Sequence, residues 1–230
     1  MSKPLVYCRE LSVNQNGKTI LIKINLEVMS GQSLAVLGPN GAGKTSLLRS
    51  LAGIIPHVVG EVKINEFNPI KLSPKILSQN FVYLPQNPMC AWDFKVSDFA
   101  EISGNNDLFE HWIHCFKIKD KWNSQLSKLS GGEKKLVHLG LAFSALGNPL
   151  KKILLLDEPT ATLDHDRAHL VSEAIKEFTE AGASVIVTTH DISLAKSCKR
   201  ILVLNEGQVL KEGSPENLLT AELVKVIGNK

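Results

Sequence analysis

The chain has 230 residues, with 26 basic and 23 acidic side chains and a formal net charge of +3. This balance is too mild for a surface that coats nucleic acid or for a polybasic membrane anchor. An apolar share of 43% and a charged share of 21% are typical of a globular domain and exclude a disordered chain.

No run of residues is long and uncharged enough to predict a membrane span. The most promising run, 136–150, has 15 residues, short of the roughly 18–20 that a bilayer requires. The four cysteines form no C-x-x-C pair, and the first residues lack the apolar stretch of a signal peptide. We therefore expect a soluble cytoplasmic protein with reduced thiols.

Short β-like runs dominate the first 85 residues. Strands are predicted at 5–8, 20–28, 33–37, 60–64 and 81–84, separated by turns such as Asn16-Gly17. From about residue 87 to 130 the apolar spacing becomes helical, as at Val96, Phe99 and Ile102.

The second half of the chain alternates helices and strands. Helices are predicted at 131–147 and 167–181, strands at 153–156 and 184–188, and then a short helix and a hairpin of 201–204 with 208–210. The two buried strands lack polar alternation, which is typical of a parallel sheet covered by helices on both faces. The predicted fold is one α/β domain over residues 1–230, with a mixed, mainly parallel sheet, an N-terminal antiparallel β layer and a helical subdomain inserted at about 87–135.

A glycine-rich loop follows the predicted strand at 33–37 and opens a helix. It reads Gly-Pro-Asn-Gly-Ala-Gly-Lys-Thr and matches G-x-x-x-x-G-K-[ST] in the strand–helix context that this motif requires. Backbone N–H groups of such a loop surround a phosphate, and the helix N-terminus adds partial positive charge. The alternative is a glycine turn without a ligand. The residues expected to bind the nucleotide are Gly38, Pro39, Asn40, Gly41, Ala42, Gly43, Lys44, Thr45 and Ser46.

Each polar side chain of this motif has a chemical use. Lys44 is suited to reach the β- and γ-phosphates, and the Thr45 hydroxyl is suited to ligate Mg²⁺.

Two acids, Asp157 and Glu158, follow the buried strand at 153–156, at the sheet edge where ligands bind in parallel sheets. Asp157 is suited to hold Mg²⁺, and Glu158 to accept a proton from a water that attacks the γ-phosphate. The alternative is two solvated acids at a strand end.

A third motif lies between these two. The segment 129–133 reads Leu-Ser-Gly-Gly-Glu before a long apolar helix, and alone it would be a helix N-cap with a flexible entry. In this order of motifs the sequence resembles the nucleotide-binding subunits of ABC transporters over essentially all of its length. The family's Q-loop glutamine corresponds to Gln86, its D-loop to 161–164 and its switch histidine to His190.

The resemblance implies a P-loop NTPase core and a head-to-tail dimer that sandwiches two ATP molecules. Ser130, Gly131 and Gly132 would then hold the γ-phosphate bound by the other copy. The resemblance further implies that His190 contacts the γ-phosphate and positions Glu158. Gln86 would sense Mg²⁺ or the attacking water, so that Glu158, His190 and Gln86 form the catalytic set and Thr45, Gln86 and Asp157 the Mg²⁺ set.

The sequence departs from the family's pattern at three places. The family's signature motif corresponds to 129–133, and here it ends in Glu133 where many members have Gln, a variant associated with importers of metal chelates and cobalamin. Lys135-Leu136 replaces the Gln-Arg step that often follows. The aromatic that usually stacks on adenine is missing around residues 14–16, and Tyr7 lies too early. Adenine would then be bound weakly, or through Gln15 or an aliphatic neighbour, and discrimination between ATP and GTP would be loose.

The function expected from the resemblance is ATP hydrolysis that powers a separate permease at the cytoplasmic face of the inner membrane. The expected cargo is a metal chelate such as a siderophore or haem, or cobalamin, delivered by an extracytoplasmic substrate-binding protein, and no nucleic-acid partner is expected. Alternatives are an exporter ATPase for haem or lipid and a soluble ATPase of iron–sulfur assembly or DNA maintenance. The aromatic segment 89–94 either packs in the core or forms an apolar groove for a helix of the membrane partner.

Overall fold

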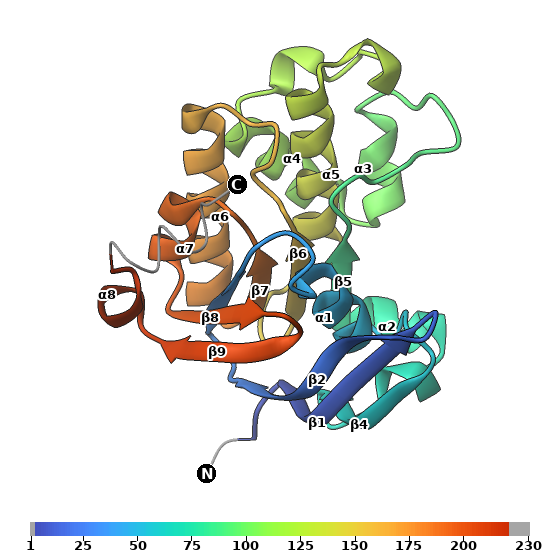
Figure 1. The fold of residues 1–230 in the computed structure, drawn as a ribbon. Coiled ribbons are helices and arrows are strands. Elements are labelled where there is room, and N and C mark those ends of the chain that lie inside the picture. Colours follow the sequence, from blue (N-terminus) through green and yellow to red (C-terminus); the bar gives the residue numbers. More distant parts are fainter. Residues whose placement is uncertain (1–2, 221–230) are drawn as a thin grey trace.

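The computed structural model describes residues 3–220, and Figure 1 shows its fold. The larger sheet has six strands in the order β5-β6-β7-β3-β8-β9. Every neighbouring pair in it is parallel except β8 with β9. The strands are β3 (Ser33–Leu37), β5 (Phe81–Leu84), β6 (Ile153–Asp157), β7 (Ser184–Thr188), β8 (Arg200–Asn205) and β9 (Gln208–Gly213). The mainly parallel sheet is thus confirmed.

A second, antiparallel sheet contains β1 (Val6–Gln15), β2 (Lys18–Val28) and β4 (Val58–Ile64) in the order β2-β1-β4. It confirms the N-terminal β layer, but β1 continues to Gln15, well beyond the predicted strand at 5–8. Its pairing with β2 shifts register after Cys8, and Glu10 adopts a left-handed φ of 51°. Such irregularities break the two-residue alternation on which strand prediction depends.

The helices fall between the strands. They are α1 (Lys44–Leu51), α2 (Pro74–Asn80), α3 (Asp98–Ser103), α4 (Asn106–Cys115), α5 (Gly131–Ala145), α6 (His165–Glu180), α7 (Ile192–Ser197) and α8 (Pro215–Leu218), with 3₁₀ turns at Pro69–Lys71, Lys119–Lys121 and Leu126–Lys128. Helix α2 was not predicted, although Ser73 caps it and Pro74 opens it, a recognisable start signal. None of the helices within residues 3–220 has the length and apolar character needed to cross a bilayer.

The larger sheet separates two hydrophobic clusters. On β3, Ala35 and Leu37 belong to one cluster, while Leu34 and Val36 belong to the other. The first cluster includes buried side chains of α3 to α6, and the second includes those of α1 and the N-terminal sheet. Since alternate side chains of a strand point to opposite faces, the uninterrupted apolar runs are explained by burial on both faces, as predicted.

Helices α3, α4 and α5 lie together at the top of Figure 1, away from the N-terminal sheet. Aromatic rings hold them together, with the rings of Trp112 on α4 and Phe143 on α5 only 4.7 Å apart. Helix α5 runs from this helical part down to the larger sheet, so it passes the expected boundary of the subdomain at residue 135. The division at 87–135 stays a prediction.

Candidate functional site

The glycine-rich loop connects the carboxyl end of β3 to α1, at the middle of the larger sheet. Two glycines are required by its backbone. Gly43 caps α1 with a left-handed φ of 102°, and a Cβ on Gly38 would lie 2.2 Å from the carbonyl oxygen of Leu204. Only glycine meets both demands without strain, so the loop follows one path and delivers the next residue, Lys44, to the start of the helix.

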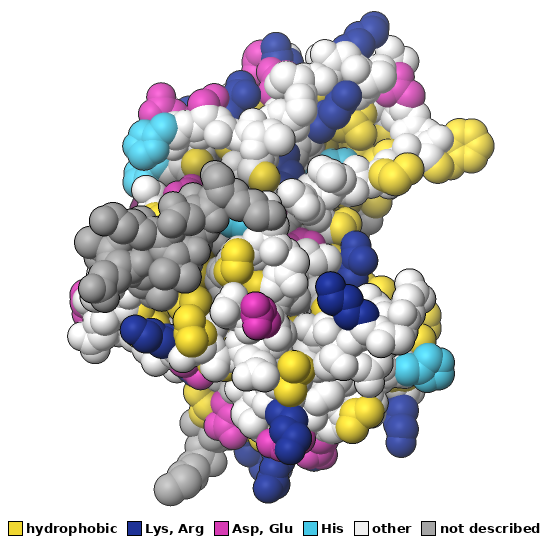
Figure 2. Space-filling model, in the orientation of Figure 1, with side chains coloured by type: hydrophobic (Ala, Val, Ile, Leu, Met, Phe, Trp, Pro, Cys, Tyr) yellow, Lys and Arg dark blue, Asp and Glu magenta, His cyan; other side chains and the backbone are white. Residues whose placement is uncertain are grey.

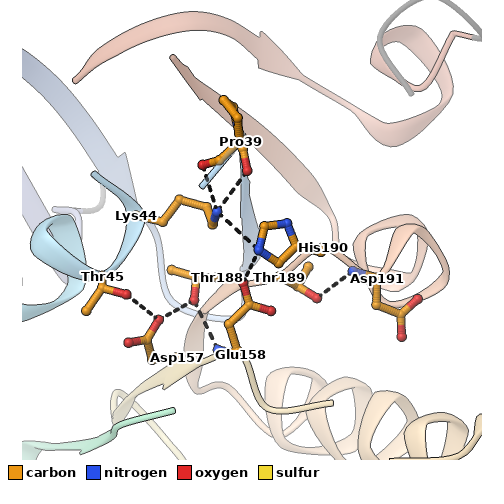
Figure 3. A network of polar contacts seen from close by, with 10 residues as sticks. Pro39, Lys44, Thr45, Asp157, Glu158, Thr188, Thr189, His190 and Asp191 are labelled. Carbon is orange, nitrogen blue, oxygen red and sulfur yellow. Dashed lines mark hydrogen bonds and ion pairs between the residues drawn. The ribbon is translucent and has the colours of Figure 1, made fainter. Parts of the chain in front are cut away.

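Lys44 points back over the loop and is buried. Its Nζ donates to the carbonyl oxygens of Gly38, at 2.8 Å, and Pro39, at 3.2 Å, and lies 3.5 Å from Nε2 of His190 (Figure 3). Burial lowers the pKa of Lys44, and the nearby charges of Glu158 and Asp157 oppose that shift. The loop thus holds a cation next to two acids.

Asp157 ends β6 and is held by hydroxyl groups from three elements. Its Oδ1 accepts from Oγ1 of Thr45, at 3.0 Å, and from Oγ1 of Thr188, at 2.6 Å. The hydroxyl of Tyr83 on β5 lies 3.5 Å from Oδ2. Figure 3 shows the two threonine contacts, which fix the carboxylate beside the first turn of α1.

Glu158 follows Asp157 and adopts a left-handed φ of 50°, a conformation that costs free energy in a residue other than glycine and that recurs at functional sites. Its N–H donates to Oγ1 and to the carbonyl oxygen of Thr188, at 3.0 and 3.1 Å. Its Oε1 lies 3.0 Å from Nε2 of His190. Burial raises the pKa of Glu158, while the charges of His190 and Lys44 oppose the rise. A carboxylate with a raised pKa is a better proton acceptor.

A cavity of about 360 Å³ joins most of the predicted site. Lining residues are Lys18, Ile20, the loop from Asn40 to Ser46, Gln86, Glu158 and His190. Gly38 and Pro39 contribute through their carbonyl bonds to Lys44, and Asp157 through Thr45. Neither Tyr7 nor Gln15 lines this cavity, whereas the half-buried Ile20 does. Of the residues that the sequence suggested for contact with adenine, the aliphatic neighbour, here Ile20, is the one that lies beside the phosphate loop.

The predicted residues Ser130, Gly131 and Gly132 do not line this cavity. They form the start of α5, where Ser130 caps the helix and exchanges hydrogen bonds with Glu133 at 3.3 and 2.8 Å. Ser130 and Gly131 are exposed, and Gly132 packs against the D-loop near Thr162. The Ser-x-x-Glu spacing is a capping-box signal that could have been recognised in the sequence.

Sequence reasoning missed two residues that orient the acids and one that holds the Q-loop. Thr188 is the last residue of a correctly predicted strand, and its place at a strand end was a usable signal. Tyr83 lies within β5 and carries no such signal. In the sequence, Lys135 stands out only because the family often has another residue type there. In the structure its Nζ donates to the carbonyl oxygen of Gln86 at 2.6 Å, a contact that sequence spacing does not reveal.

The family model described as ABC transporter matches residues 21–161. The chain is 34% identical over 226 residues to the hemin import ATP-binding protein HmuV of Photobacterium damselae subsp. damselae, which covers 94% of this chain and 85% of the relative. It is also 35% identical over 230 residues to the protein of the same name from Pseudomonas aeruginosa, and this match covers 94% of this chain and 89% of the relative.

The fold has solved counterparts. The structure of cbiO1 from Clostridium perfringens, part of the ABC transporter complex cbiONQ, is 25% identical, with a TM-score of 0.80 and coverage of 97% of this chain and 93% of that one. The family model covers more than half of the chain, and the cavity contains the family's phosphate loop, glutamate and histidine. The chain therefore belongs to the ABC transporter family and is an ATP-hydrolysing, ATP-binding domain of it.

Proposed function

We propose that this protein is the ATPase subunit of an importer and that it powers a separate permease for haem or a related metal chelate. Its relatives are named for hemin import, which favours this cargo over the export, iron–sulfur and DNA alternatives. The observation that carries the proposal is the joint position of Lys44, Glu158 and His190 in one cavity at the phosphate loop.

The arrangement supports in-line attack of water on the γ-phosphate of ATP. Glu158 accepts the proton of the attacking water, the bond from the γ-phosphorus to the bridging oxygen breaks, and ADP leaves. His190, 3.0 Å from Glu158, orients that carboxylate and contacts the γ-phosphate. Lys44 exchanges its carbonyl contacts for phosphate oxygens and offsets the charge that develops there.

Mg²⁺ fits the oxygen donors that surround the first turn of α1. The Thr45 hydroxyl and the Asp157 carboxylate are already within 3.0 Å of each other, and Gln86 lines the same cavity. These are the hard oxygen ligands that Mg²⁺ prefers. When bound, the ion would neutralise charge on the β- and γ-phosphate oxygens, and these three residues would hold it.

A second copy of the chain completes the site in this proposal. The exposed Ser130 and Gly131 stand at the N-terminus of a 15-residue helix, where N–H groups and the helix dipole favour an anion. Ser130 and Gly131 do not line the nucleotide cavity of their own chain. In this proposal they therefore bind the γ-phosphate of the ATP that is held by the phosphate loop of the other copy. The dimer is then head-to-tail, with two equivalent ATP sites.

The permease would dock beside the Q-loop, in a groove of about 530 Å³ that Gln86, Trp92 and Ser127 help to line. Trp92 is 74% exposed, whereas Phe94 is half-buried, with its ring 6.0 Å from that of Phe99. Of the two alternatives that the sequence left open for the segment 89–94, core packing describes Phe94 and an exposed apolar surface describes Trp92. In Figure 2 hydrophobic side chains gather on the upper right of the molecule, where Figure 1 shows the loop between β5 and α3.

In this proposal the protein works at the cytoplasmic face of the inner membrane, bound to its permease. Import further implies an extracytoplasmic substrate-binding protein that delivers the chelate. Exposed apolar groups such as Trp92 are suited to contact with another protein, and in this proposal they attach the ATPase to its permease.

Replacing the proposed base tests the hydrolysis mechanism. Glu158→Gln should lower kcat by about 100-fold or more, because the amide cannot accept the proton. ATP binding should persist, so the variant should elute as a dimer with ATP. The control is Glu180→Gln, an exposed acid at the end of α6, which should hydrolyse ATP normally. Normal turnover by Glu158→Gln would remove this residue from the mechanism.

The nucleotide base provides a second test. An aliphatic Ile20 contacts either purine ring without reading its edge, so a competition assay should give less than about a tenfold preference for ATP over GTP. A larger preference would mean that a polar group of the cavity recognises adenine.

The docking surface predicts different outcomes for two neighbouring aromatics. Trp92→Ala should leave basal ATPase activity intact and abolish uptake by the assembled transporter, because an exposed anchor is lost. Phe94→Ala should instead lower the melting temperature by about 4 °C or more. Full uptake with Trp92→Ala would contradict docking at this surface.

A further inference from the structure

Lys135 is a buried lysine near the start of α5. Its exposed fraction is 4%, and its Nζ lies 2.6 Å from the backbone carbonyl oxygen of Gln86. Burial lowers the pKa of Lys135 to about 8, although Asp157 and Glu158 act against the shift from a longer distance. Burying an ammonium group lowers the stability of the fold when its close contact is a carbonyl rather than a carboxylate. Stability therefore does not explain why a lysine occupies this position, and a functional role does.

The hydrogen bond joins two functional segments that are far apart in the chain. Gln86 follows β5 and lines both the nucleotide cavity and the groove beside Trp92. Lys135 lies little more than one turn beyond the capped end of α5 that carries Ser130. The two segments are therefore linked by a charge-assisted bond, which is stronger than a bond between neutral groups, in addition to the packing of α5 beside the Q-loop.

The hydrogen bond to Gln86 is the main polar contact of Lys135. One turn further along α5, His138 packs edge-on against Phe99, with 5.6 Å between ring centroids. Burial and the charge of Lys135 lower the pKa of His138 to about 4, so this imidazole is neutral at pH 7 and brings no competing charge. The ammonium stays directed to the Q-loop.

We propose that Lys135 is a positioning residue for ATP hydrolysis, holding the backbone of Gln86 so that its side chain stays aligned with Glu158 and so that movements of α5 reach the Q-loop. The inference rests on the proposed role of Gln86 at the γ-phosphate. Lys135 does not touch the phosphate loop, which provides most of the contacts to ATP in the proposed site, so we expect its loss to affect kcat more than ATP affinity.

Steady-state kinetics of three variants test this role. Lys135→Met removes the donor, and it should lower kcat about tenfold while the KM for ATP changes less than about twofold, because only the aligned state is lost. Lys135→Arg keeps a charged donor and should restore kcat to within about threefold of the wild type. Lys176→Met, at an exposed position on α6, should match the wild type. Melting curves are recorded for each variant.

The outcomes separate this inference from the proposed function. An inactive wild-type protein would refute the ATPase assignment itself. An active wild type with an equally active Lys135→Met would refute only the positioning role. That role would also be refuted if Lys135→Met did not fold, or if Lys135→Arg were as slow as Lys135→Met, because the lysine would then act through packing.

Discussion

Four neighbouring parallel strands of the larger sheet, β5, β6, β7 and β3, end at the same edge, and the site depends on that alignment. Each strand end contributes to the site: Gln86 follows β5, Asp157 ends β6 and Glu158 follows it, Thr188 ends β7 with His190 two residues later, and the phosphate loop follows β3. Residues more than 100 positions apart in sequence are thereby brought to hydrogen-bond distance, as Thr45 and Asp157 are. The two hydrophobic clusters on either face of the sheet keep these ends in register.

Within the site, hydroxyl groups organise the acids before a nucleotide arrives. Thr188 holds both Asp157, through its Oγ1, and the N–H of Glu158. This hydroxyl therefore fixes the left-handed backbone that turns Glu158 toward His190. Groups fixed in advance need little reorganisation when charge develops on the phosphate. In the proposed dimer, this half-site would be completed by the N-terminus of α5 from another copy, because Ser130 and Gly131 do not line the cavity of their own chain.

Much of the fold and the phosphate site could be predicted from the sequence because each depends on local patterns. The apolar run before Asp157 and the glycine spacing before Lys44 each mark a structure that forms close to its own residues. The contacts that were missed, such as Lys135 with Gln86, join segments 49 residues apart and depend on how α5 packs. The length of β1 was missed for another reason, since the shift in register near Glu10 hides the alternation.

The head-to-tail assembly is the central claim, and complementation between two inactive chains tests it most directly. Lys44→Ala disables the phosphate loop and Ser130→Phe disables the signature, so neither variant alone should hydrolyse ATP. In an equimolar mixture half of the dimers pair the two chains, and each pair has one intact site, so about a quarter of the wild-type rate should return. A mixture as inactive as its components, or a Ser130→Phe chain that is fully active alone, would contradict the account.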